Sequence, residues 1–434
     1  MVTFLRLLVR IISFLIRPWQ RKWRPGMPIE CLVVGYGGAN NTGAEARTIE
    51  AIKQMLDADP RISITLTSLD RRRTLRYLDE HDRLHVVGIN PIFIFSMTKL
   101  VMRSDIVVLA EGSCFKENFS PALLWFFMFS ADLAQRLLLP TVAYGVDAGE
   151  LTPSNARWAL DVANKMDLIM MRTAAAAELL RSKGVNTNIA VTTDTAFTLL
   201  PQKRQWAETV LTGQGIDLKK PIVGIAFEEL FWWPVMPSFF KAALGVKRDR
   251  YKSIYYHTWP NHGRHKSAVI KEAVANYADW VAQEFNAQVV FFAMESLDIE
   301  PCQDVMHQMK TSSISIDADH ASAAKMAAFL RRLDWLVTCR YHAFVLAMCG
   351  LVPAIGIGHD ERIASIMDEM NLLNGYFIPY EEERVLALLK DKTKTLLVDA
   401  DNIKKKMERA LPIYFERMAE NEKLFGELVR KKFI

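Results

Sequence analysis

Short apolar runs alternate with helical patterns along most of this chain, and that alternation restricts its fold more than any other feature. In the first half, runs rich in Val, Ile, Leu and Met are each followed by a segment whose apolar residues recur with helical spacing. The expected strands lie at 29–34, 62–67, 85–87, 106–110, 141–144, 168–171 and 189–192. Strands that are connected through helices run parallel, and helices cover both faces of their sheet. The first half therefore predicts a doubly wound, Rossmann-like α/β domain.

The alternation lapses in a polar stretch around 198–220 and then restarts, which indicates a second domain. At 434 residues the chain also exceeds one ordinary hydrophobic core. We expect the fold class α/β, with two Rossmann-like domains that face each other across a cleft, as in glycosyltransferases of the GT-B type. The expected units are an N-terminal helix at 1–26, domains at 27–200 and 221–380, a linker at 201–220 and helices at 381–434.

Charge and cysteine usage exclude some classes of protein. Basic residues exceed acidic ones by a formal charge of +5 and gather at the two ends of the chain. This mild excess argues against an extended nucleic-acid groove and fits an anionic ligand or an anionic membrane surface. The five cysteines include no CxxC pair, so we expect reduced thiols in a cytoplasmic protein, with neither a zinc site nor disulfides.

The segment between residues 227 and 267 is crowded with aromatic residues and holds three histidines. Aromatic residues on a loop over a cleft often stack on sugar rings. A hydrophobic flap packed on its own domain explains the composition equally well. His257, His262 and His265 have no Cys, Asp or Glu at a clear ligand spacing, so we expect no metal there.

The first 26 residues are apolar, interrupted by Arg6 and Arg10, and close with basic and Trp residues. The apolar run is too short and too charged to span a bilayer, and no small-residue cleavage site follows it. We expect a helix that lies in the membrane interface, with Trp19 and Trp23 at headgroup depth. The alternative is a helix packed on another domain or protomer.

Two successive strands of the second half end in polar side chains. The strand expected at 335–338 leads into a turn with Arg340 and His342, and the strand at 354–357 leads to a polar group that includes Arg362. Ligands of parallel α/β sheets bind at such strand ends. Two cations and an imidazole suit a ligand that carries phosphate and carboxylate groups.

A glycine-rich loop follows the first strand and precedes a helix. Its glycines permit close approach of the backbone, and a helix N-terminus offers N–H groups to an anion, although the spacing is not GxGxxG. Acceptor sugars also bind such loops. Asn40, Asn41 and Glu45 are well placed to recognise hydroxyl groups.

These motifs resemble those of the polysaccharide pyruvyltransferase family. The resemblance rests on the string Asn41-Thr42-Gly43-Ala44-Glu45-Ala46, on Asp194-Thr195-Ala196-Phe197, on Arg340 and His342, and on the string GLVPAIGI. The chain departs from the family at three places. Glu111-Gly112-Ser113 stands where most members have two or three glycines, and Thr173 replaces the acidic neighbour of Arg172. His359 and Arg362 replace an aromatic residue and a Lys.

The resemblance implies a transferase that moves the three-carbon unit of phosphoenolpyruvate onto two hydroxyls of one sugar as a pyruvate ketal. It places Arg172, His342 and Arg362 at the donor, and we add Arg340 from its position beside His342. His342 is the expected general acid, because protonation of the vinyl carbon needs a group that titrates near neutrality. Phosphoenolpyruvate is then a co-substrate, and no cofactor is expected.

The acceptor is expected to be a glycan or a lipid-linked glycan at the cytoplasmic face of the inner membrane. The residues expected to contact it are Gly37, Asn40, Asn41, Glu45 and Glu111. No nucleic acid partner is expected, and homo-oligomerisation stays open.

Each of these residues also has a plainer interpretation. An Arg at a strand end is often only a salt-bridge residue, a His beside an Arg often only a hydrogen-bonding one, and Asp194 could cap the segment that follows it. Two rival functions stay open as well: a nucleotide-sugar-dependent GT-B glycosyltransferase, and a non-catalytic scaffold of a glycan-assembly complex. The strand ends offer few glycines and a compact cationic pair, which favours a smaller anion than a nucleotide.

Overall fold

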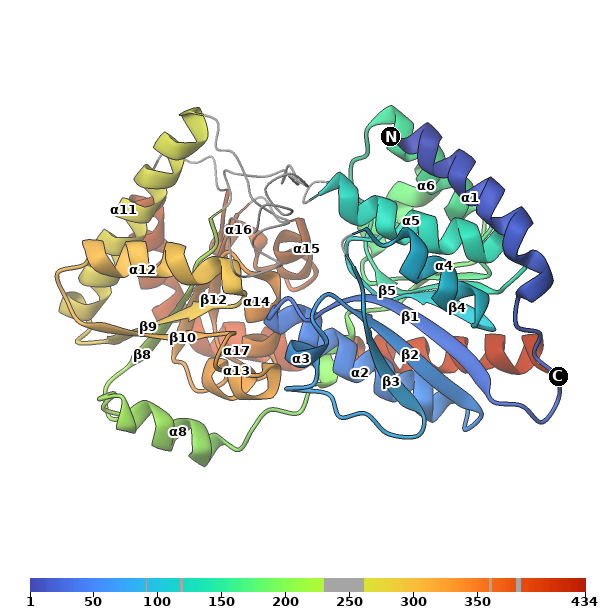
Figure 1. The fold of residues 1–434 in the computed structure, drawn as a ribbon. Helices are drawn as coiled ribbons and strands as arrows, with labels where there is room; N and C mark the ends of the chain where they lie inside the picture. The colour runs from blue at the N-terminus through green and yellow to red at the C-terminus, as the bar shows by residue number, and fades with distance from the viewer. Residues whose placement is uncertain (91, 118–119, 230–260, 359–360, 380–383) are drawn as a thin grey trace.

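Two parallel β-sheets, each flanked by helices, make up the computed structural model of the chain (Figure 1). The structure describes residues 1–434 except 91, 118–119, 230–260, 359–360 and 380–383. Most of the aromatic segment, with His257, and the motif residue His359 therefore lie outside the described residues. The α/β class predicted from the alternation is confirmed.

The first sheet has seven strands in the order β3-β2-β1-β4-β5-β6-β7, all parallel. The strands are β1 (Ile29–Gly37), β2 (Ile62–Ser68), β3 (Leu84–Gly88), β4 (Ile106–Leu109), β5 (Thr141–Val146), β6 (Leu168–Met171) and β7 (Ile189–Val191). The helices are α2 (Thr42–Ala58), α3 (Arg71–Thr74), α4 (Ile94–Met102), α5 (Pro121–Arg136), α6 (Pro153–Ala163) and α7 (Ala174–Ser182). The central strands are buried on both faces, which explains why they read as continuous apolar runs.

The second sheet has six parallel strands in the order β10-β9-β8-β11-β12-β13. They are β8 (Ile222–Ala226), β9 (Gln288–Ala293), β10 (Ser313–Asp317), β11 (Trp335–Thr338), β12 (Ala354–Ile357) and β13 (Phe377–Ile378). The helices are α11 (Asn261–Glu284), α12 (Ile299–Gln308), α13 (Ala323–Leu330), α14 (Tyr341–Met348), α15 (Glu361–Glu369) and α16 (Leu373–Tyr376). In both sheets the strand order reverses beside the first strand, β1 or β8, as in other doubly wound folds.

The stretch at 201–220, expected as a linker, contains helix α8 (Arg204–Gly213). Ala207 and Leu211 of this helix are buried in the apolar core of the second domain. Nε of Arg332 donates to Oε1 of Glu208 at 2.9 Å and ties α8 to the same domain. The short helix η2 (Thr195–Thr198), which precedes α8, places Phe197 in that core as well.

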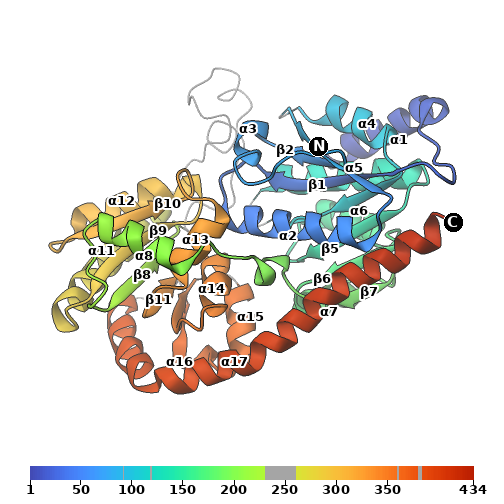
Figure 2. The ribbon, with the colours of Figure 1, turned by 90° about the horizontal axis from the view of Figure 1, so that it is seen from below.

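The C-terminal segment, expected as several helices, forms one long helix, α17 (Val385–Lys432), which runs along both domains (Figure 2). Met407 and Tyr414 join the core of the second domain, whereas Phe425 and Val429 join the core under the first sheet. Pro412 lies inside the helix without ending it. Because its apolar stripe is divided between two cores, α17 couples the two domains.

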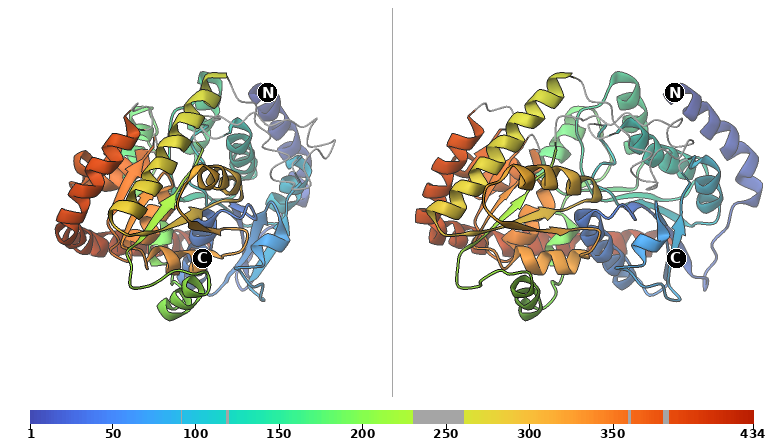
Figure 3. Two further views of the ribbon diagram at one scale, coloured as in Figure 1. Left: turned by 90° about the vertical axis from the view of Figure 1, so that its left-hand side faces the viewer. Right: turned by 60° about the vertical axis from the view of Figure 1, so that its left-hand side comes forward.

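The N-terminal segment forms helix α1 (Val2–Ile16) and a short helix η1 (Arg17–Trp19), which lie against the outside of the first domain (Figure 3). Leu5 and Val9 are buried against α5 and α6, and Arg6 forms an ion pair with Asp161 of α6. Among the described residues no helix has the length and apolar character needed to cross a bilayer.

Candidate functional site

A cavity of about 560 Å³ lies between the two domains. Its lining includes Asn41, Glu111 and Lys116 from loops that follow strands β1 and β4 of the first domain. Arg340 and His342 follow β11 of the second domain, and Arg362 follows β12. The carboxyl ends of both sheets therefore supply the site, and its volume is typical of small-ligand pockets.

The turn after β11 positions Arg340 and His342. The Arg340 N–H donates to Oγ1 of Thr338 at 2.9 Å, so the chain turns sharply as the strand ends. Arg340 is the residue that precedes α14, and His342 stands in the first turn of that helix. The structure thus brings together the two residues that the sequence pairs at this strand end.

Three buried carboxylates surround the guanidinium of Arg340. Its Nε donates to Oδ2 of Asp298 at 2.8 Å, its Nη2 donates to Glu295 at 3.0 Å, and its Nη1 lies 3.1 Å from Glu228. Burial, together with the charge of Glu295, raises the pKa of Asp298 to about 6 although Arg340 opposes the shift. Arg340 therefore adds little net positive charge to the cavity.

The imidazole of His342 is enclosed between the two domains. Its Nε2 lies 3.4 Å from Oδ2 of Asp194 without hydrogen-bond alignment. Its Nδ1 packs on Gly43 so closely that a β-carbon at that position would collide with the ring. Burial lowers the pKa of His342, Asp194 opposes this shift, and the charges of Arg172 and Arg362 add to it. Burial thus favours the neutral form of the imidazole.

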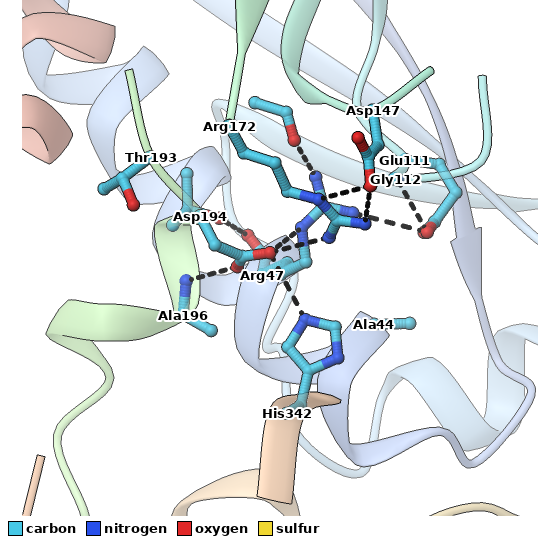
Figure 4. Close-up of polar contacts among 12 residues, drawn as sticks. Ala44, Arg47, Glu111, Gly112, Asp147, Arg172, Thr193, Asp194, Ala196 and His342 are labelled. Atoms are coloured by element: carbon cyan, nitrogen blue, oxygen red, sulfur yellow. Dashed lines mark hydrogen bonds and ion pairs between the residues drawn. The ribbon is translucent and has the colours of Figure 1, made fainter. Parts of the chain in front are cut away.

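A buried ion network lies behind His342 (Figure 4). Nη1 of Arg172 donates to Oδ2 of Asp194 at 2.8 Å, and Nη2 of Arg172 donates to Oδ2 of Asp147 at 2.9 Å. Nε of Arg47 lies 3.3 Å from the same oxygen of Asp194. Arg172 is fully buried and is absent from the cavity lining, so it holds the two carboxylates in place behind the wall. Asp194 also caps η2, because its Oδ1 accepts the Ala196 N–H at 3.0 Å.

One wall of the cavity is rich in cations. Nζ of Lys116 lies 3.6 Å from Oδ2 of Asp147. The Arg362 guanidinium lies 5.0 Å from the ring centre of Tyr341, and the Arg172 guanidinium lies 5.1 Å from the same centre. Burial raises the pKa of Asp147, but the charges of Arg172, Lys116 and Arg362 outweigh burial and hold that pKa below its usual value. This wall therefore suits a small anion.

The residues expected at an acceptor sugar divide into two groups. Asn41 and Glu111 line the cavity, and Oδ1 of Asn41 also accepts the Ala44 N–H at 2.9 Å as the cap of α2. Gly37, Asn40 and Glu45 are absent from the lining. Gly37 ends β1.

Asn40 and Glu45 join the two domains. Nδ2 of Asn40 donates to Oδ1 of Asp319 at 2.6 Å, and Oε2 of Glu45 accepts the Ala323 N–H at 3.1 Å. Burial raises the pKa of Glu45 to about 8. A backbone hydrogen bond also joins the two domains: the Thr42 N–H donates to the Met294 carbonyl at 2.8 Å.

Sequence reasoning missed several groups of the site: Arg47, Lys116, Asp147, Tyr341 and the carboxylates around Arg340. Lys116 and Asp147 carried a usable signal, because each follows an apolar strand of the first domain. Arg47 carried none, since a single Arg in a helix is ordinarily at the surface. Among the described side chains, no group of three His, Cys, Asp or Glu residues is arranged to hold a metal ion.

Comparison with known proteins places the chain among transferases of polysaccharide synthesis. A family model described as polysaccharide pyruvyl transferase matches residues 41–361. No curated protein matches the chain in sequence.

Several solved structures share the whole two-domain arrangement. HepE of Anabaena in complex with UDP-glucose is 12% identical, with a TM-score of 0.57 over 93% of this chain and 100% of that chain. A glycosyltransferase of Rickettsia africae is 12% identical, with a TM-score of 0.58 over 93% and 99%. A putative UDP-N-acetylglucosamine 2-epimerase of Listeria monocytogenes is 14% identical, with a TM-score of 0.58 over 92% and 95%. These likenesses confirm the GT-B type of fold.

Proposed function

The chain belongs to the polysaccharide pyruvyl transferase family, and from this membership and the cavity we propose that it transfers the three-carbon unit of phosphoenolpyruvate to sugar hydroxyls as a ketal. The observation that carries the proposal is the convergence of His342 with Lys116 and Arg362 at one cavity between the domains. These side chains come from three separate strand ends of the two sheets.

The donor suits the cationic wall. Phosphoenolpyruvate carries a carboxylate and a phosphate on three carbons, so it needs two basic groups close together. The guanidinium of Arg362 lies over the ring of Tyr341, and Lys116 lines the cavity from the other domain. Arg340, held by three carboxylates, acts instead as a fixed part of the wall that orients the turn before His342.

Binding of the donor changes the protonation of His342. A multiply charged anion beside the imidazole favours the imidazolium form and raises the pKa that burial has lowered. His342 then donates its proton to the methylene carbon of the donor, which becomes a methyl group, and the adjacent carbon gains oxocarbenium character. A sugar hydroxyl adds to that carbon and returns its proton to His342. A second hydroxyl displaces phosphate from the same carbon, and its proton leaves with the phosphate, which completes the ketal.

The acceptor approaches from the first domain. Asn41 and Glu111, which line the cavity from the first domain, offer an amide and a carboxylate to sugar hydroxyls. The chemistry requires two hydroxyls of one sugar within reach of a single carbon. A glycan or a lipid-linked glycan meets this requirement.

A direct test is release of phosphate from phosphoenolpyruvate in the presence of candidate glycans. The wild-type protein should release phosphate only with an acceptor that carries a suitable diol, and His342→Ala should abolish the release. Release at the wild-type rate by His342→Ala would contradict the role given to His342.

A nucleotide-sugar glycosyltransferase is the second candidate, because the fold matches that of HepE, which was solved with UDP-glucose. Thermal shifts with phosphoenolpyruvate, UDP and GDP discriminate between the two. A shift with phosphoenolpyruvate alone supports the first proposal. A shift with a nucleoside diphosphate alone supports the second.

A further inference from the structure

We infer that helix α1 and the segment after it dock the protein on an anionic lipid bilayer. This surface lies apart from the cavity residues, so the inference stands whatever the donor is. It starts from the two faces of α1: Leu5 and Val9 fix the helix to α5 and α6, while a second apolar stripe points away from the protein. The exposed stripe consists of Phe4, Leu7, Ile11, Phe14 and Leu15, and Trp19 extends it.

The exposed stripe is unusual for a protein in water. Phe14 is 82% exposed and Trp19 is 72% exposed, although both are large and apolar. Helix α4, which also packs on α5, carries a further exposed aromatic side chain, Phe95, at 83% exposure. Contiguous apolar surface of this kind marks an interaction site, whereas single exposed apolar residues do not.

The charges around the stripe select the partner. Residues 1–29 contain six basic residues and no acidic one. Arg6 and Arg21 form ion pairs with Asp161 and Asp105. The other four are exposed: Arg10, Arg17, Lys22 and Arg24.

A second cavity lies at the C-terminal end of α1 and continues the basic surface. Its volume is about 590 Å³, and its lining residues include Lys22, Lys165 and Lys432 together with Asp105 and Asp167. Nζ of Lys432 lies 2.6 Å from Oδ1 of Asp167, so the basic residues outnumber the acidic ones without excluding them. Apolar side chains flanked by Arg, Lys and Trp are the features that hold a helix in the interface of an anionic bilayer. A second protein would bury the apolar stripe equally well, but it would gain less from a border on which basic residues outnumber acidic ones.

The direction of α1 relates this surface to the cavity. Nε2 of Gln20 donates to the Leu137 carbonyl at 3.0 Å, which places the end of α1 beside the end of α5. The two helices run in the same direction (Figure 1), and Leu123 near the start of α5 lines the cavity. The apolar stripe therefore extends toward the cavity side of the first domain, where a lipid-linked acceptor would arrive if the proposed function holds.

Flotation of the full chain with vesicles tests this inference without any donor or acceptor. We expect the protein to float with vesicles made of equal parts phosphatidylcholine and phosphatidylglycerol, and to bind phosphatidylcholine vesicles much more weakly. Ile11→Asp combined with Phe14→Asp should lower the partition coefficient at least about tenfold, because two charges replace inserted apolar groups. Val398→Asp on α17 is the matched control, since Val398 is 91% exposed and lies far along the chain from the stripe.

The basic residues have their own test. Arg10→Gln combined with Arg17→Gln should weaken binding to the anionic vesicles and reduce its sensitivity to salt, because fewer charges then contribute. Absence of flotation with either vesicle would overturn the inference. So would a wild-type dimer that the Ile11→Asp and Phe14→Asp pair converts to a monomer, since a second copy of the chain would then be the partner.

Discussion

Nε2 of His342 lies 3.4 Å from Oδ2 of Asp194, so a residue of the second domain meets a buried carboxylate of the first. Asp194 opposes the fall in the His342 pKa that burial causes. Its own pKa is held well below the usual value because Arg47, His342 and Arg172 together outweigh the effect of burial. The protonation of the imidazole therefore depends on the junction between the two domains.

Replacement of this carboxylate tests the dependence. Asp194→Asn removes the negative charge beside His342, so the pKa of His342 should fall further. The protonated form of a general acid is lost as pH rises through its pKa. Because the pKa of His342 is lower in this variant, the alkaline decline of kcat/KM should move to lower pH. Loss of the partner of Arg172 should also cost about 3–5 kcal/mol of unfolding free energy. The measurements are pH profiles of phosphate release and denaturant unfolding, with the exposed Asp57→Asn as control.

Gly43 provides the space that His342 occupies. A β-carbon there would collide with the imidazole ring, so Gly43→Ala should displace His342 and lower kcat/KM about 100-fold or more, the range expected for a misplaced catalytic group. Gly213→Ala is the control, because a β-carbon at Gly213 meets no atom within 4 Å. A Gly43→Ala protein with wild-type kinetics would show that the imidazole position does not matter.

Tyr341 supports two guanidiniums with one ring. Tyr341→Leu should loosen Arg362 and raise the KM for phosphoenolpyruvate about tenfold, since a buried cation–π contact contributes up to about 2 kcal/mol. Tyr341→Phe keeps the ring and should change the KM less than about threefold. Equal effects of the two substitutions would assign the role of Tyr341 to its hydroxyl group.

Glu45 should make the stability of the domain junction depend on pH. Its pKa is about 8 in the folded protein and near the ordinary value when unfolded. The folded state retains the proton that the unfolded state has lost, so this group should lower the unfolding free energy by about 1.4 kcal/mol per pH unit between about pH 5 and 8. Glu45→Gln, which resembles the neutral carboxyl group, should flatten that slope in denaturant titrations. An unchanged slope would mean that Glu45 is ionised in the folded protein.

The central strands of both sheets were predictable because parallel strands buried on both faces leave continuous apolar runs in the sequence. The outer strands of the second sheet, β10 and β13, were not expected. Helix α8 was not expected, since its polar outer face conceals the two residues, Ala207 and Leu211, that reach the core. The C-terminal segment was expected as several helices, whereas packing on two cores carries a single helix through Pro412.

The candidate site was predictable only at the strand ends. Arg340 and His342 stand together after one strand, and the structure places both at the cavity. The three carboxylates around Arg340 come from segments up to 70 residues apart, at Glu228 and Asp298, and no local pattern links them. Contacts between segments that lie far apart in the sequence leave no periodic signal in either segment.

The central claim is that His342 protonates the methylene carbon of phosphoenolpyruvate, and solvent deuterium tests it most directly. The reaction run in D₂O with an active acceptor should give a ketal whose methyl group carries one deuterium, detected by NMR, with one phosphate released per ketal. His342→Gln should lose both products together. Wild-type yields from His342→Gln, or phosphate release with no deuterium in the product, would contradict the account.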